Sequence, residues 1–215
     1  MAETPSIAID PRTTALVIQD LQNDTVSEGG AFADTGSFDH AKAQDVVANV
    51  ARLARGARGA GIPVIHVWYI VEEGARGLQL NAPLYRGIKD SGAVVRGSWG
   101  AAPAEGLEPQ KGDFVVEKTR MNGFYGTRLD PLLRAMGTET LIITGAWTNM
   151  SIEHTARHAA DAGYRAVVVS DGTSTMNADW HRAAIEYALT NVAEIVTVSD
   201  LLNAIEGSSN ASAVD

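Results

Sequence analysis

The chain has 215 residues, of which 45% are hydrophobic and 20% are charged, and its formal net charge is -9 at pH 7. These proportions are ordinary for a globular protein, and the length suits one domain, which we place at residues 1–207. The negative charge argues against a nucleic-acid partner, because binding to a phosphate backbone needs clustered Lys and Arg. The lack of cysteine excludes disulfides and thiolate-bound metals.

No segment of the sequence predicts contact with a membrane. The first nine residues lack the basic and apolar regions of a secretory signal. The longest apolar runs, such as residues 166–169, are far too short to span a bilayer. We therefore expect a cytoplasmic protein with no membrane partner. Residues 208–215, which are Ser, Ala, Asn, Val and Asp, are expected to form a disordered tail.

Six short apolar runs predict the strands of a buried sheet. Runs that are rich in β-branched residues and do not alternate are typical of strands covered on both faces. In chain order they are residues 15–19, 64–68, 113–117, 140–144, 166–170 and 194–198. Apolar residues at helical spacing predict the intervening helices at 39–59, 129–136, 151–162, 178–191 and 199–205. This alternation predicts an α/β fold, a three-layer α/β/α arrangement with a central, mostly parallel six-stranded sheet.

Residues 70–112 show no clean period and contain many glycines. We interpret them as a long irregular excursion over the edge of the sheet. Long loops in compact domains are often functional lids, whereas a plain surface loop or an oligomer contact explains the same composition. Both interpretations remain open at the level of sequence.

Three polar residues lie where predicted strands end. Asp20 follows the first strand, Lys118 follows the strand at 113–117, and Ser151 follows the strand at 140–144 after a short link. Taken singly, Asp20 and Ser151 read as helix caps and Lys118 as solvated surface. Ligands of open α/β sheets bind at the carboxyl ends of the strands, however. The convergence of a carboxylate, an ammonium and a hydroxyl on that edge therefore favours a catalytic site.

Three segments resemble the isochorismatase-like cysteine hydrolase family. They are ALVIQDLQND at 15–24, VVEKTRMNGFYGT at 115–127 and LIITGAWTNMSIEHTARHAADAG at 141–163, and they stand in the family's order. The similarity spans roughly residues 11–200, and the motif RGSWG in the excursion looks most like that of ureide- and carbamoyl-cleaving amidohydrolases. The resemblance implies a Rossmann-like fold, hydrolysis of a C–N bond in a small amide, carbamoyl or ureido substrate, and a homo-oligomer, either dimer or tetramer.

The resemblance also implies a catalytic set of Asp, Lys and Cys, which maps by position to Asp20, Lys118 and Ser151. In the family mechanism a thiolate attacks the carbonyl and forms an acyl-enzyme, while the Asp moves the proton and the Lys supplies a fixed positive charge. A cis peptide bond is implied between Ala146 and Trp147. The backbone amides of Trp147 and Ser151 are implied to form the oxyanion hole.

Serine at position 151 departs from this pattern. A Cys thiol has a pKa of about 8.5, whereas a Ser hydroxyl is far less acidic, and an ordinary Asp is a poor base for it. We expect weak or absent turnover. Two origins are open, namely a replacement of Cys by Ser and a natural variant. Isochorismatases proper also lack the Cys, so a vinyl ether hydrolase is one alternative, and a catalytically inactive ligand-binding pseudoenzyme is another.

Four residues are predicted to contact the substrate. Thr25 and Trp147 lie where the family builds the pocket wall, and the large Trp147 would shrink the pocket. Arg120 is expected to contact a carboxylate, and Phe124 an apolar face. Ordinary packing is the alternative for each of them.

The histidines do not predict a metal site. A nicotinamidase-like metal cluster would need several ligands after the second strand, where the sequence offers only His66, inside a strand. His154 and His158 have i,i+4 spacing but no acidic partner on the same face, so we interpret them as surface or interface residues. We expect no metal and no cofactor. Trp180 and His181 are candidates for the rim of the pocket.

Overall fold

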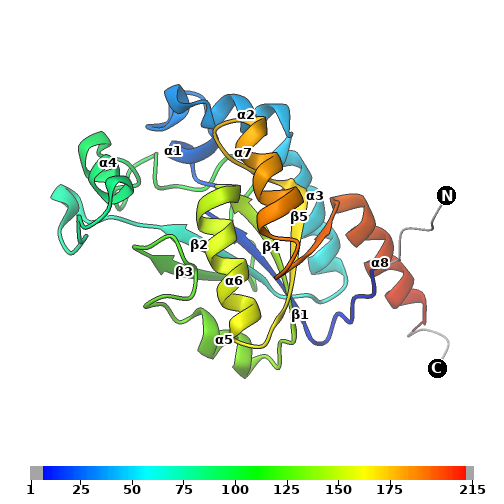
Figure 1. Ribbon diagram of the computed structural model, residues 1–215. Helices are drawn as coiled ribbons and strands as arrows, with labels where there is room; N and C mark the ends of the chain where they lie inside the picture. Colours follow the sequence, from blue (N-terminus) through cyan, green and yellow to red (C-terminus); the bar gives the residue numbers. More distant parts are fainter. Residues whose placement is uncertain (1–6, 212–215) are drawn as a thin grey trace.

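The computed structural model describes residues 7–211, and a six-stranded sheet forms its centre (Figure 1). The strands run in the order β3-β2-β1-β4-β5-β6, and all neighbouring pairs are parallel. Their bounds are Thr14–Gln19 (β1), Val64–Tyr69 (β2), Phe114–Lys118 (β3), Thr140–Ala146 (β4), Arg165–Ser174 (β5) and Glu194–Val196 (β6). The predicted α/β fold is confirmed, with a sheet that is parallel throughout.

Helices cover both faces of the sheet. The α-helices are Asn23–Val26 (α1), Ser37–Ala43 (α2), Val46–Gly59 (α3), Pro83–Ser91 (α4), Leu129–Ala135 (α5), Glu153–Asp161 (α6), Ala178–Ala183 (α7) and Val198–Ala211 (α8). Short 3-10 turns lie at Ala33–Thr35 (η1) and Glu73–Ala75 (η2), and π-helical turns at Thr148–Ile152 (η3) and Ala184–Ala188 (η4).

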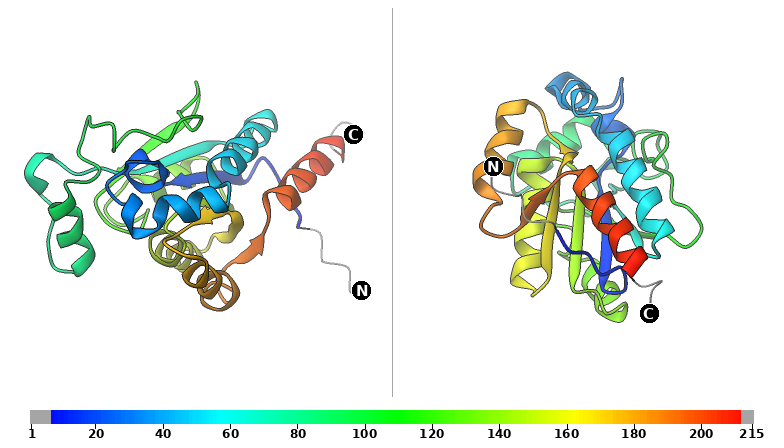
Figure 2. Two further views of the ribbon diagram at one scale, coloured as in Figure 1. Left: turned by 90° about the horizontal axis from the view of Figure 1, so that it is seen from above. Right: turned by 90° about the vertical axis from the view of Figure 1, so that its right-hand side faces the viewer.

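The side chains of β1 show how the two cores are divided. Leu16 and Ile18 join the core that packs on α3 and α8, while Ala15 and Val17 join the core that packs on α5 and α6. Successive side chains of a strand point to opposite faces, so a strand between two helical layers must be apolar at every position. The end-on view in Figure 2 shows α3 and α8 on one side of the strands and α6 and α7 on the other.

The predicted helix at 39–59 is two helices, because the chain breaks at Asp45. This residue has φ 51°, in the left-handed region that Asp tolerates better than most residues. α8 extends to Ala211, so residues 208–211 of the predicted tail belong to this helix in the structure. The Ser208 hydroxyl donates to the Ile9 carbonyl, which ties this end of α8 to the start of β1. Residues 212–215 lie outside the described residues.

The excursion at 70–112 is more regular than its sequence suggested. It contains α4, which projects beyond the carboxyl ends of the strands (Figure 1). Its apolar residues form a small core of their own, in which Tyr85 and Ile88 of α4 meet Tyr69 of β2. Within residues 7–211, none of the helices has the length and apolar character that a bilayer span requires.

The segment after Asp20 fastens this excursion to the sheet. The Gln22 side chain donates to the carbonyls of Tyr69 and Ala101, and the Asn23 side chain donates to the Trp99 carbonyl. Asp24 accepts hydrogen bonds from the Ala31 and Val94 amides, and its carboxylate lies so close to Gly100 that a Cβ there would overlap it. The motif QND therefore positions the excursion over the end of the sheet.

Candidate active site

Asp20 leaves β1 in a conformation that aims its side chain over the end of the sheet. Its φ is 57°, in the left-handed region, and its side chain is 8% exposed. Gly145, on the neighbouring β4, makes this exit possible, because a Cβ at that position would collide with the Gln19 carbonyl. Strained backbone of this kind is typical of functional positions.

Lys118, the last residue of β3, meets Asp20 across the width of β2. Its Nζ donates to Asp20 Oδ2 at 2.7 Å and to the Arg120 carbonyl at 2.9 Å. The ammonium also lies 4.6 Å from the centre of the Tyr69 ring, and the Tyr69 hydroxyl donates to the Thr119 carbonyl. The Tyr69 ring thus packs against the Lys118 ammonium, and its hydroxyl is held by the Thr119 carbonyl. The sequence analysis missed Tyr69, since an aromatic at the end of a buried strand reads as core.

Burial dominates the electrostatics of this pair. It raises the pKa of Asp20, and the charge and hydrogen bond of Lys118 offset this only in part. Burial likewise lowers the pKa of Lys118. Asp20 Oδ1 has no hydrogen-bond partner among the described residues, although the Ser151 hydroxyl is close enough to favour the charged carboxylate. Asp20 is therefore a stronger base than the ordinary Asp that the sequence argument assumed.

Ser151 lies in η3, the turn that opens α6 directly after β4. It is buried, and the peptide bond between Ala146 and Trp147, where the sequence predicted a cis bond, is cis. The first amides of a helix carry partial positive charge, which favours an anion beside them. Lys118 is hydrogen-bonded to Asp20, and Asp20 lines the same space as Ser151, so the three residues lie together at one edge of the sheet.

Asp20 and Ser151 line a small space, called here the inner cavity. Its volume is about 30 Å³, which is room for one or two water molecules. The lining residues are Asp20, Thr25, Phe32, Tyr69, Leu84, Ile88, Val94, Met121, Ala146, Trp147 and Ser151. Thr25 and Trp147, which the sequence analysis expects to contact the substrate, are among these lining residues.

The Trp147 indole is fixed by residues that the sequence analysis did not single out. Its Nε1 donates to the Ser37 hydroxyl at 2.6 Å, and the Ser37 hydroxyl donates to the Thr25 carbonyl. The Phe32 ring meets the indole edge to face, with ring centres 5.0 Å apart. No local sequence signal marks Ser37 or Phe32, because their role depends on a contact with a residue more than a hundred positions away.

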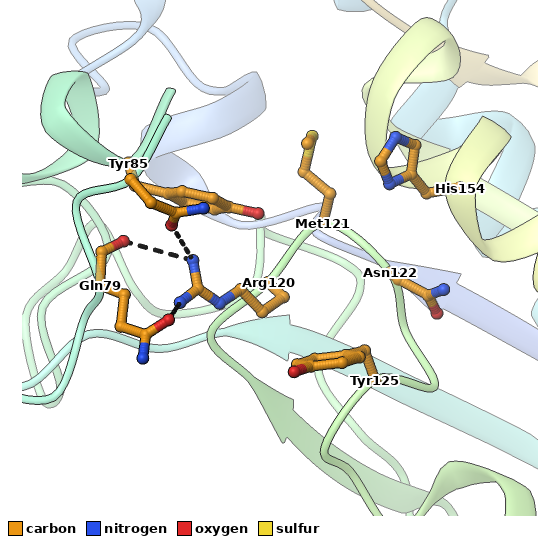
Figure 3. A pocket seen from close by; sticks show the side chains of 8 residues that line it. Gln79, Tyr85, Arg120, Met121, Asn122, Tyr125 and His154 are labelled. Carbon is orange, nitrogen blue, oxygen red and sulfur yellow. Dashed lines mark hydrogen bonds between the residues drawn. The ribbon is translucent and has the colours of Figure 1, made fainter. Parts of the chain in front are cut away.

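A second, open hollow lies beside the inner cavity and is called here the outer cavity (Figure 3). Its volume is about 330 Å³, and its lining residues are Gln79, Asn81, Tyr85, Arg120, Met121, Asn122, Tyr125 and His154. Met121 lines both cavities. Arg120, predicted to contact substrate, therefore faces the outer cavity.

Phe124 is not part of either lining, so its contact with substrate remains a prediction that these two cavities do not support. It is 5% exposed and packs in the core between the sheet and α6. Its ring stacks on His158 with centres 4.6 Å apart, and His158 Nδ1 also contacts the Asn122 amide. His158 is thus half-buried against Phe124 rather than a free surface residue, whereas His154 is exposed.

The other histidines have partners of their own. His66 is buried in β2 with its Nε2 3.2 Å from Asp113 Oδ2, as expected of a core histidine. His181 contacts the Thr148 hydroxyl and the Gln44 amide, so it lies beneath η3 rather than at a pocket rim. Burial and the nearby His40 lower the pKa of His181 to about 4. The described part of the chain holds no group of three or more His, Asp or Glu side chains arranged to bind a metal ion.

Comparison with known proteins agrees with this fold. The Isochorismatase domain family model matches residues 14–200, so the chain belongs to the isochorismatase family. Ureidoacrylate amidohydrolase RutB of Methylobacterium radiotolerans is 36% identical over 199 residues, covering 86% of this chain and 76% of the relative. The protein of the same name from Agrobacterium fabrum is 32% identical, with 95% of each chain covered.

Solved structures show that other proteins share this fold. A cysteine hydrolase from Pseudomonas syringae pv. phaseolicola superposes with a TM-score of 0.84 at 25% identity, covering 97% of this chain and 100% of the other. N-carbamoylsarcosine amidase from Thermoplasma acidophilum superposes with a TM-score of 0.65 at 25% identity, covering 86% and 96%.

Proposed function

We propose that this protein is an amidohydrolase that cleaves the C–N bond of a small amide, carbamoyl or ureido compound. The observation that carries the proposal is the buried contact between Lys118 and Asp20 beside the side chain at position 151. The relatives named ureidoacrylate amidohydrolase and N-carbamoylsarcosine amidase support this chemistry.

In the proposed mechanism Asp20 takes the proton of the nucleophile at position 151 as that nucleophile attacks the substrate carbonyl. The amides of Trp147 and Ser151 stabilise the oxyanion, helped by the positive end of the following helix. Asp20 then returns the proton to the leaving nitrogen, which departs as the C–N bond breaks. A water molecule, deprotonated by Asp20, releases the acyl group in the second half of the reaction.

Lys118 has an electrostatic role in this scheme. Without its charge, burial would raise the pKa of Asp20 further and favour the protonated carboxyl. The hydrogen bond to Oδ2 also leaves Oδ1 free to face the nucleophile. The ammonium thus keeps Asp20 both charged and oriented.

Substrate binding requires the inner cavity to open. A volume of about 30 Å³ is too small for a ureide. The excursion contributes Leu84, Ile88 and Val94 to the wall, and the loop after β3 contributes Met121. We propose that these side chains move outward when substrate enters, which makes the excursion a lid.

The serine gives a vinyl ether hydrolase as a second candidate. That reaction needs an acid rather than a covalent nucleophile, and a raised pKa suits Asp20 to donate a proton. It releases a carbonyl compound such as pyruvate, whereas the proposed amidase releases ammonia. In the third alternative, a pseudoenzyme, the site binds ligand without turnover.

Replacing Ser151 by Cys tests the proposal. Because a thiolate is a far better nucleophile, we expect Ser151→Cys to release ammonia from a panel of small ureides and amides, at a rate about a hundredfold or more above the unchanged chain. The matched control is Ser174→Cys, which adds a thiol at a fully buried serine outside the cavity lining and should release none. A vinyl ether probe that carries an enolpyruvyl group is assayed in parallel: pyruvate release from it, without ammonia from the panel, would support the second candidate, and neither product would support the pseudoenzyme.

We further propose that the chain forms a homo-oligomer. Several large apolar side chains are well exposed, among them Trp180 and Tyr187, which are 47% and 66% exposed. Light scattering at two protein concentrations tests this proposal, and a monomeric mass at both would contradict it.

A further inference from the structure

Arg120 is a cation without an anionic partner at the mouth of the site. Its guanidinium donates to the Gln79 carbonyl, the Gln79 side-chain oxygen and the Asn81 side-chain oxygen, at 3.0–3.3 Å. It also lies 4.3 Å from the centre of the Tyr85 ring. All of these groups are neutral, and across residues 7–211 no carboxylate lies within salt-bridge distance of Arg120.

Among the described residues, five other arginines also lack a salt bridge, but Arg120 differs from them because it alone lines the outer cavity; the five are Arg52, Arg55, Arg76, Arg86 and Arg128. Six other arginines of the described chain, those at positions 12, 58, 96, 134, 157 and 165, pair with a carboxylate at 3.0 Å or less. The lining of the outer cavity contains no Asp or Glu. The outer cavity is therefore a polar hollow whose one permanently charged side chain is positive.

The short segment from Lys118 to Met121 connects the Arg120 side chain to the pair formed by Lys118 and Asp20. Lys118 points into the active site and donates to the Arg120 carbonyl, so the backbone at Arg120 is held by the catalytic pair itself. The Arg120 side chain extends the other way into the outer cavity, and Met121 follows it as the residue common to both linings (Figure 3). A molecule that passes Met121 would occupy both cavities at once.

We propose that the outer cavity binds a carboxylate of the substrate, through Arg120, while the amide or ureide end of the same molecule reacts in the inner cavity. The substrates are then acidic amides or ureides, and neutral ones of the same length are poor. An Arg guanidinium offers a planar pair of N–H donors that match a carboxylate, and such charge-assisted hydrogen bonds are about twice as strong as neutral ones. This inference rests on the proposed function for the reaction of the amide or ureide end of the substrate. The binding of the carboxylate by Arg120 does not depend on that reaction.

The test compares an acidic ureide with a neutral one in the Ser151→Cys protein. The probes are N-carbamoyl-β-alanine and n-butylurea, which have similar length. In Arg120→Gln we expect KM for N-carbamoyl-β-alanine to rise about ten- to hundredfold, and KM for n-butylurea to change little. The matched control is Arg86→Gln, because Arg86 is an exposed arginine of α4 that donates to the Leu80 carbonyl but does not line the cavity. It should change neither KM. Equal changes for the two probes, or no change for the acidic one, would overturn the inference.

Calorimetric binding to the unchanged Ser151 chain separates this inference from the proposed function. If Ser151→Cys hydrolyses neither probe, the proposed function fails, but N-carbamoyl-β-alanine should still bind and lose that affinity in Arg120→Gln. Absence of binding, or binding that survives Arg120→Gln, would overturn the inference. Hydrolysis of both probes with equal efficiency would leave the function standing and remove the carboxylate site.

Discussion

Two buried aspartates at opposite ends of the sheet differ in how completely they are bonded. Asp113, just before β3, accepts two hydrogen bonds from Arg58 and one from the Gln110 amide, and it contacts His66. Asp20, just after β1, accepts one hydrogen bond from Lys118, and its Oδ1 has no partner among the described residues. Their side chains are 3% and 8% exposed.

The pKa values of the two aspartates move in opposite directions for this reason. Burial acts to raise both of them. At Asp113 the hydrogen bonds from Arg58, Gln110 and His66 outweigh burial, so the pKa is lowered. At Asp20 burial outweighs Lys118, so the pKa is raised. A fully bonded buried carboxylate holds the structure together, whereas one with a free oxygen remains available as a base.

The largest expected effect is on catalysis. In the Ser151→Cys protein, Asp20→Asn should lower kcat for ammonia release by about 10²–10⁴-fold, the usual contribution of a general base. Asp113→Asn, the matched change at the other end of the sheet, should leave kcat nearly unchanged. Steady-state kinetics of both variants measures the difference, and the comparison breaks if Asp113→Asn is as damaging as Asp20→Asn.

The next effect is on stability. Asp113→Asn should lower the free energy of unfolding by about 1–3 kcal/mol, because it removes charge-assisted hydrogen bonds from a buried site. Since the folded-state pKa of Asp113 is lowered, its stabilisation is present above the ordinary value of 3.8 and is lost as pH falls through the folded-state pKa. The deficit of the variant should therefore shrink on acidification.

Urea unfolding at several pH values measures this deficit. The control is Asp10→Asn, which breaks an exposed pair with Arg12 and should not move the urea midpoint. A constant deficit down to the lowest pH at which the chain stays folded would contradict the assigned role of Asp113.

The smallest effect is a shift in titration. Carboxyl chemical shifts in the Ser151 chain should show Asp20 titrating above the ordinary value of 3.8 and Asp113 still charged at that pH. Lys118→Met should move the titration of Asp20 further up, because it removes the positive charge that opposes burial. A titration of Asp20 below 3.8 would mean that Lys118 outweighs burial, and the contrast between the two aspartates would disappear.

The sequence by itself determined the sheet and the three ends that carry Asp20, Lys118 and position 151. Strands buried on both faces are apolar throughout, and parallel strands joined by helices must bring their carboxyl ends to one edge, so local pattern was enough. The strand pattern alone did not identify Thr25 and Trp147 as residues of the pocket wall. That prediction came from the family resemblance.

Only the tertiary structure decided which side chains meet. Arg120 and Phe124 stand four residues apart in one loop, yet one faces the outer cavity and the other the core. The regular structure within residues 70–112 was also not predictable from the sequence. It is held by contacts with Gln22, Asn23 and Asp24, about seventy positions away. Local propensity does not encode such contacts, and the pKa of a buried carboxyl depends on every group that surrounds it.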